Sequence, residues 1–211
     1  MPAVLFALVV AWTVMLLFGG MDLDRGLLAF FYAGDRPPEL TVAARILTEL
    51  GGYRVLIPLA IAGAILLLVR RRYSSATLLL AITLGGRVLV ELQKMQTARL
   101  RPVAHEHLVE VQTLSFPSGH AANSTMVYLS LALLLTTGYP RRAIAVWSAV
   151  WLAILIGASR LVLGVHWPSD VIAGWAFGLA WTLLLLRLAG HDLGDGTPRA
   201  TNVPPAQTAP S

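Results

Sequence analysis

The chain has 211 residues, of which 56% are hydrophobic and only 13% are charged, and its formal net charge is +5. This composition leaves too little polar surface for a soluble domain of this length, so the chain is expected to lie in a lipid bilayer. Cysteine is absent, which excludes disulfides, thiolate chemistry and Cys-based zinc sites. The arginines form short clusters between apolar runs rather than one basic face, which argues against a nucleic-acid partner.

Apolar segments of about 17–20 residues can cross a bilayer core as helices. Six such segments occur, and the second is short and contains Pro58: residues 3–19, 54–69, 74–92, 121–137, 143–159 and 171–188. Helices satisfy their own backbone groups in lipid, so the sequence predicts an all-α integral membrane bundle of six transmembrane helices. The first segment lacks the basic start of a secretory signal and is expected to remain as a span.

Arginine clusters orient these predicted spans. Residues 70–72 join the second span to the third, and Arg141 and Arg142 join the fourth to the fifth. Because cytoplasmic loops favour Lys and Arg, both clusters and both termini are expected in the cytoplasm, with the protein in the cell (inner) membrane. The connections 20–53, 93–120 and 160–170 then face the periplasm or exterior.

The predicted spans form one domain over residues 1–190, with a motif-bearing core at 93–188. Residues 191–211 are rich in Pro, Thr, Ala and Gly and are expected to be a disordered tail. Residues 21–32 mix acidic and basic side chains with Leu and Phe, which is typical of a short helix at the membrane interface.

Three segments within the last two outward connections hold the residues suited to chemistry. They are Lys94, Arg101, Ser118, Gly119, His120, Arg160, His166 and Asp170. The predicted topology places all of them at the same face of the membrane. They suit phosphoryl transfer, whose transition state needs positive charge and N–H donors around the phosphoryl oxygens.

Five of these residues suit phosphate binding. Lys94, the only lysine in the chain, Arg101 and Arg160 supply positive charge. Ser118 supplies a hydroxyl donor, and Gly119 lets the backbone approach an anion at the start of the fourth predicted span.

The other three form the predicted catalytic set. His166 and Asp170 are four residues apart, so they share one helical face if the last helix begins near residues 167–168. A carboxylate on one ring nitrogen fixes the tautomer and leaves the other nitrogen of His166 free to attack phosphorus. His120 is then available as the general acid that protonates the departing oxygen. These roles need no metal or other cofactor.

Three ordered motifs carry these residues: Lys-x6-Arg-Pro from Lys94, Pro-Ser-Gly-His ending at His120, and Ser-Arg-x5-His-x3-Asp ending at Asp170. Together they resemble the three-part signature of the type 2 phosphatidic acid phosphatase (PAP2) superfamily, over roughly residues 93–188. The resemblance implies a membrane lipid phosphatase that forms a phosphohistidine at His166, which water activated by His120 then hydrolyses.

Several alternatives stay open at this point. The lipid can be an isoprenoid diphosphate such as undecaprenyl diphosphate, a glycerolipid such as phosphatidic acid or phosphatidylglycerol phosphate, or a lipid A phosphate. Some members of the family transfer phosphate to an acceptor other than water. A transporter or scaffold that holds anionic lipid needs the cations but not the histidines.

Two further groups of polar residues are given structural interpretations. Arg87 lies inside the third predicted span, where a pair with Glu91 one turn later would reduce the cost of its charge. Residues 105–107, His-Glu-His, resemble a metal-binding fragment, but flanking histidines in a loop are typically exposed to solvent, so no metal site is expected.

Overall fold

A computed structural model describes residues 1–19, 21–32, 37–103, 108–109, 111 and 113–191. Every regular element in these ranges is helical. In chain order the helices are α1 (Pro2–Phe18), α2 (Asp22–Tyr32), α3 (Pro38–Leu50), α4 (Tyr53–Val69), α5 (Tyr73–Leu80), η1 (Ala81–Gly85), α6 (Gly86–Thr97), α7 (Gly119–Leu135), α8 (Arg142–Val162) and α9 (Pro168–Leu188).

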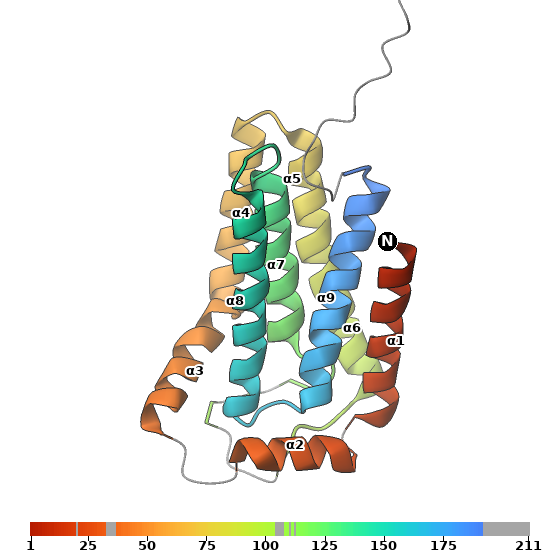
Figure 1. Cartoon of the computed structure of the whole chain (residues 1–211), viewed down its shortest axis with the longest axis vertical. Coiled ribbons are helices and arrows are strands. Elements are labelled where there is room, and N and C mark those ends of the chain that lie inside the picture. Colours follow the sequence, from red (N-terminus) through yellow and green to blue (C-terminus); the bar gives the residue numbers. More distant parts are fainter. Residues whose placement is uncertain (20, 33–36, 104–107, 110, 112, 192–211) are drawn as a thin grey trace, which may run out of the picture.

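Helix α7 runs through the middle of the bundle, with α4, α5, α6, α8 and α9 packed around it (Figure 1). Most of its side chains are buried, as expected for a helix that is apolar on every side. Its small polar residues bond to carbonyls of the preceding turn, as Thr125 does to Ala121 at 2.8 Å. The helix that carries His120 is therefore held from all sides.

Two glycines of α9 allow it to lie against α7. A Cβ atom added at Gly174 would be 2.7 Å from the carbonyl oxygen of Ser118, and one added at Gly178 would be 2.7 Å from that of Ala122. Small residues four apart let helix backbones approach closely, which is the common means of helix association in membranes. This approach brings the start of α9 next to the start of α7.

A short π-helical segment, η1, interrupts the run from α5 to α6. The indole N–H of Trp181 donates to the carbonyl of Ile82 within this segment at 3.0 Å, so a side chain of α9 satisfies backbone that the π geometry exposes. The run still continues without a gap from Tyr73 to Thr97, which places Lys94 on a helix rather than in the predicted connection.

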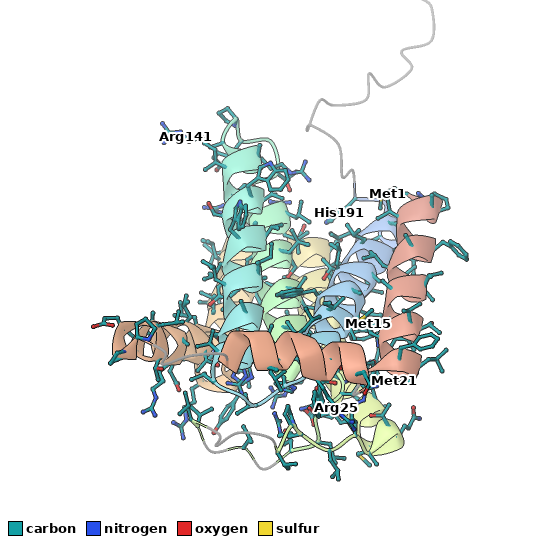
Figure 2. All side chains as sticks on the ribbon, turned by 60° about the horizontal axis from the view of Figure 1, so that its bottom comes forward. Met1, Met15, Met21, Arg25, Arg141 and His191 are labelled. Carbon is teal, nitrogen blue, oxygen red and sulfur yellow. The ribbon has the colours of Figure 1, made fainter. Side chains whose placement is uncertain are left out.

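The two turns that carry arginine clusters lie at one end of the bundle. The α4–α5 and α7–α8 turns, with their arginines, lie at the same end as the N-terminus and the last turn of α9, as the positions of Arg141, Met1 and His191 show (Figure 2). Helix α2, which includes Arg25, lies across the opposite end of the bundle (Figures 1 and 2). The basic turns are therefore remote from α2.

By length and apolar composition, three helical runs in the described part of the chain can cross a membrane: Tyr73–Thr97, Arg142–Val162 and Pro168–Leu188. The number becomes four if α3 and α4, which meet at a bend of 41°, form one broken span. Helix α1 is apolar but shorter. These runs make the chain a membrane protein, whereas the count of six spans stays a prediction.

All six predicted segments coincide with helices of the bundle, with ends that differ by a few residues. The predicted interfacial helix at 21–32 corresponds to α2, whereas α3 lies in a segment predicted only as an outward connection. Most of the predicted tail, residues 192–211, lies outside the described residues.

Candidate active site

The three motif segments meet at the end of the bundle that α2 crosses (Figure 1). Lys94 is in the last turn of α6 and Arg160 in the last turn of α8, while His120 starts α7 and Asp170 lies in the first turn of α9. Arg101 and His166 belong to the connections between these helices. Helix ends thus carry most of the site, which is why residues distant in sequence converge there.

His166 is a buried imidazole with a partner at each ring nitrogen, and only 2% of the residue is exposed. Its Nδ1 lies 3.5 Å from Oδ2 of Asp170 and 3.4 Å from the hydroxyl of Ser115. That hydroxyl donates to the same Oδ2 at 2.5 Å. Ser115 therefore lies between the imidazole and the carboxylate, so its oxygen can accept the Nδ1 proton while its own proton goes to Asp170.

On the other side of the ring, Arg101 donates from NH1 toward Nε2 of His166 at 3.1 Å. The same guanidinium is fixed by the carbonyl of Val165 and by the carbonyl of Thr113, the latter at 2.7 Å from its Nε. Arginine has donors only, so Nε2 must offer a lone pair. This arrangement selects the neutral tautomer with its proton on Nδ1.

Burial and charge act on His166 in the same direction. Loss of solvent contact, followed by the positive charges of Arg101, Arg160 and Lys94, lowers the pKa of His166 well below its ordinary value of 6.5. The imidazole is therefore neutral at neutral pH and can act as a nucleophile without first losing a proton.

Two further cations are buried at the site. Lys94 contacts Glu91 at 3.2 Å and the hydroxyl of Thr113 at 3.5 Å. Arg160 is 3% exposed and donates to the hydroxyl of Thr48, while its Nε atom has no hydrogen-bond partner. Within the described ranges no carboxylate forms an ion pair with Arg160. Glu49 acts on Arg160 only through its longer-range charge. A buried cation without a close ion-pair partner is costly, so this end of the bundle favours an anion.

The start of α7 supplies neutral donors beside these cations. The hydroxyl of Ser118, the N-cap residue, is buried and has no hydrogen-bond partner. A Cβ atom added at Gly119 would be 3.4 Å from Nζ of Lys94, so the glycine keeps the space beside the ammonium open. His120 is half-buried and lies within electrostatic reach of His166. A free helix N-terminus next to a cation is a favourable place for a phosphate.

All eight predicted site residues are thus in one region of the structure, but sequence reasoning missed two that contact the predicted carboxylate. Ser115 donates to Oδ2 of Asp170, and Arg99 forms an ion pair with its Oδ1 at 2.9 Å. In the sequence their only signal is that they lie close to motif residues. Arg99 precedes Arg101 by two positions, and nothing in the sequence showed that the two arginines contact different groups.

The structural interpretations of the remaining polar residues have mixed outcomes. The prediction that Glu91 pairs with Arg87 is wrong, because the carboxylate of Glu91 contacts Lys94 and the guanidinium of Arg87 lies 6.0 Å from the ring centre of Tyr53. The His-Glu-His fragment at 105–107 lies outside the described residues.

Comparison with known proteins identifies the family. Residues 3–192 match the model of the PAP2 superfamily. The chain belongs to the PAP2 superfamily. Phosphatidylglycerophosphatase B of Bacillus subtilis is 33% identical over 163 residues, which cover 74% of this chain and 77% of that protein. Undecaprenyl-diphosphatase of Sulfolobus acidocaldarius is 33% identical over 149 residues, which cover 66% of this chain and 65% of that one.

A solved structure is also similar. The crystal structure of a transmembrane PAP2 type phosphatidylglycerolphosphate phosphatase from Bacillus subtilis superposes with a TM-score of 0.80 at 27% identity, covering 88% of this chain and 96% of that one. The family and its phosphatase relatives make the chain a hydrolase of phosphoric ester bonds, and its apolar helices make it a membrane enzyme.

The lowered pKa of His166 predicts a pH-dependent stability. Below about pH 6.5 the unfolded chain takes up a proton on this residue that the folded chain does not bind, so stability falls with pH by up to about 1.4 kcal/mol per pH unit. The His166→Asn variant lacks this contribution. Thermal unfolding followed by tryptophan fluorescence should show that the wild type loses more stability than His166→Asn between pH 7.5 and pH 5.5. Equal losses in the two proteins would contradict a lowered pKa of His166.

Proposed function

We propose that this PAP2 enzyme removes phosphate from a lipid phosphate or diphosphate through a covalent phosphohistidine at His166. One observation carries the proposal: a buried, neutral imidazole lies against Arg101 at 3.1 Å, in a region that also holds the buried cations Lys94 and Arg160. Lipid binding needs only the cations. It does not need a neutral imidazole whose Nδ1 contacts both Ser115 and Asp170.

The first step is attack of Nε2 of His166 on phosphorus. An incoming phosphoryl oxygen replaces Nε2 as an acceptor for Arg101, which frees the lone pair for the reaction. The N–P bond forms as the bond to the lipid oxygen breaks, and His120 gives its proton to that oxygen. The negative charge of the bound phosphate favours the protonated form of His120 needed for this step.

The second step returns the enzyme to its starting state. His120, now neutral, takes a proton from water as the water oxygen attacks phosphorus and the N–P bond breaks. Inorganic phosphate leaves, while His120 keeps the proton for the next cycle. Lys94, Arg101 and Arg160 hold the phosphoryl oxygens through both steps, with the hydroxyl of Ser118 and the backbone at Gly119 as further donors.

The proposed membrane placement has six passes, through α1, α4, α5–α6, α7, α8 and α9, within a single domain of residues 1–190. Side chains on the outside of the bundle support it, since Phe6 is 72% exposed and Trp147 64%. The site lies opposite the basic turns at 70–72 and 141–142, which favours an extracytoplasmic site and cytoplasmic termini in the inner membrane. The lipid would enter laterally, keeping its tail in hydrocarbon.

A glycerolipid phosphate such as phosphatidylglycerol phosphate is the first candidate substrate, because the Bacillus relative and the similar crystal structure both carry that activity in their names. An isoprenoid diphosphate is the second, supported by the name of the Sulfolobus relative. Lipid A phosphates are a third class to be assayed. Phosphate transfer to an acceptor other than water is measured in the same assays.

The catalytic proposal predicts that His166→Asn lowers phosphate release by at least about 10³-fold, because the nucleophile is lost. The purified protein in detergent would be assayed against these lipid classes with and without a chelator. His191→Asn, at the opposite end of the bundle, is the matched control and should keep full activity. Substantial turnover by His166→Asn would overturn the mechanism, and lipid binding without any hydrolysis by the wild type would favour a scaffold.

The topological proposal can be tested directly because the chain has no cysteine. A cysteine at Val103, which is 91% exposed near the site, should react in intact cells with a maleimide that cannot cross membranes. A cysteine at Tyr139, which is 57% exposed in the α7–α8 turn, should react only after permeabilisation. The reverse pattern would place the site in the cytoplasm.

A further inference from the structure

The guanidinium of Arg99 holds the oxygen of Asp170 that faces away from His166. Its NH1 lies 2.9 Å from Oδ1 of Asp170, and its NH2 donates to the last-turn carbonyls of α1, at 3.2 Å to Met15 and 2.7 Å to Leu16. The group also lies over the ring of the fully buried Phe116, with its central carbon 4.3 Å from the ring centre. These contacts fix the plane and the position of the guanidinium.

With Oδ1 held in this way, the orientation of the carboxylate is set. Its other oxygen, Oδ2, accepts from the hydroxyl of Ser115 at 2.5 Å and from the backbone N–H of Trp167 at 3.0 Å. A carboxylate fixed at both oxygens cannot rotate, so Oδ2 stays directed toward the Ser115–His166 contact. Arg99 therefore controls which way the orienting oxygen points.

A second carboxylate supports Arg99 from the helix that crosses the end of the bundle. Asp24 of α2 is 5% exposed, and it accepts the backbone N–H of Ser169 at 2.9 Å and the hydroxyl of the same residue. Because that hydroxyl gives its proton to Asp24, its oxygen is free to accept from NH1 of Arg99, which lies 3.2 Å away. A continuous series of contacts thus runs from α2 to Asp170.

Helix α2 lies at the face where the membrane surface is proposed to be. It crosses the end of the bundle (Figure 2), and Leu27 on its outer side is 42% exposed while Asp24 and Leu28 on its inner side are buried. The helix is therefore amphipathic and has one buried charged residue, which contacts the first turn of α9. The other two charged residues of the helix, Asp22 and Arg25, are exposed.

We propose that Arg99 and Asp24 are positioning residues for the reaction, Arg99 by holding Asp170 and Asp24 by holding Arg99 through Ser169. The inference rests on the proposed function, because Asp170 matters to catalysis only if His166 is the nucleophile. It makes α2 a part of the active site although none of its described residues contacts His166.

A purely structural role would have a different signature. If these contacts only join α1, α2 and α9, their loss would lower the unfolding temperature but leave kcat unchanged in the folded protein. If they position Asp170, kcat falls while KM changes little, because substrate binding depends on other residues. A misplacement of about 1 Å can cost on the order of 10²-fold in rate.

The Arg99 variants test the direct contact. Arg99→Gln should lower kcat by about 10²-fold with KM within about threefold of the wild type. Arg99→Lys should restore part of this loss, because it returns the charge but not the two-pronged geometry. Arg45→Gln, which removes an exposed arginine from α3, is the control and should keep wild-type kcat.

The Asp24 variants test the longer path with a control on the same helix. Asp24→Asn should lower kcat about tenfold, because an amide keeps the size but loses the charge and one acceptor. Asp22→Asn makes the identical change at a fully exposed position, 3.8 Å from Arg25, and should have no effect. In the Arg99→Gln background, Asp24→Asn should cause no further loss, since its effect passes through Arg99.

The measurement is steady-state phosphate release by the full chain in detergent, on the lipid phosphate that the wild type cleaves fastest, with an unfolding temperature for each variant. An inactive wild type contradicts the proposed function rather than this inference. An active wild type with unchanged kcat in folded Arg99→Gln, or with equal effects of Asp24→Asn and Asp22→Asn, overturns the inference. Should Arg99→Gln not fold, Arg99→Lys and the two aspartate variants decide the question.

Discussion

The rest of the site depends on the contacts that Asp170 makes. It is fully buried, it accepts the backbone N–H of Trp167 and so caps α9, and it forms an ion pair with Arg99. The backbone carbonyl of the same residue accepts the N–H of Ser118 at 2.9 Å, which fixes the start of α7. One residue thus joins the helix end that carries the predicted acid to the connection that carries the predicted nucleophile.

The electrostatics of the site follow from placing cations where water is scarce. Lys94 and Arg160 are buried. Burial of His166 lowers its pKa, and the positive charges of Arg101, Arg160 and Lys94 lower it further. The same charges favour a phosphoryl group, whose arrival offsets the cost of burying them. The neutral nucleophile and the group of cations around it are therefore two results of one arrangement, and the substrate completes the charge balance.

Sequence reasoning was successful where periodicity or length decides the outcome. The six apolar segments coincide with helices apart from a few residues at their ends, and α9 begins at Pro168, near the residues 167–168 that were the condition for pairing His166 with Asp170. His166 itself lies just before this helix. It was less successful where tertiary contacts decide. Helix α3 is amphipathic rather than apolar, so a search for spans did not detect it, although its Thr48 contacts Arg160. The π segment depends on a bond from Trp181, which no local pattern reveals.

The same distinction applies to the site. Motif spacing predicted eight residues that the structure places in one region, because helix ends meet at this end of the bundle. It did not show that Ser115 lies between His166 and Asp170, since that contact joins two connections far apart in sequence. Nor did it show that Arg99 and Arg101 contact different groups, because outside helices and strands no regular repeat sets the direction of successive side chains. Apolar helices of 17 residues, such as α1, also fall between the criteria for membrane and core helices.

The central claim is that phosphorus becomes bonded to His166 during turnover. Rapid mixing of the enzyme with a radiolabelled lipid phosphate, quenching in alkali within the first turnover, and mass spectrometry of the peptides test it directly. The account predicts a label that is stable in base, labile in acid and located on residue 166. A label that survives acid on a serine, or single turnovers with no covalent label although the trap succeeds with a known phosphohistidine enzyme, would contradict it.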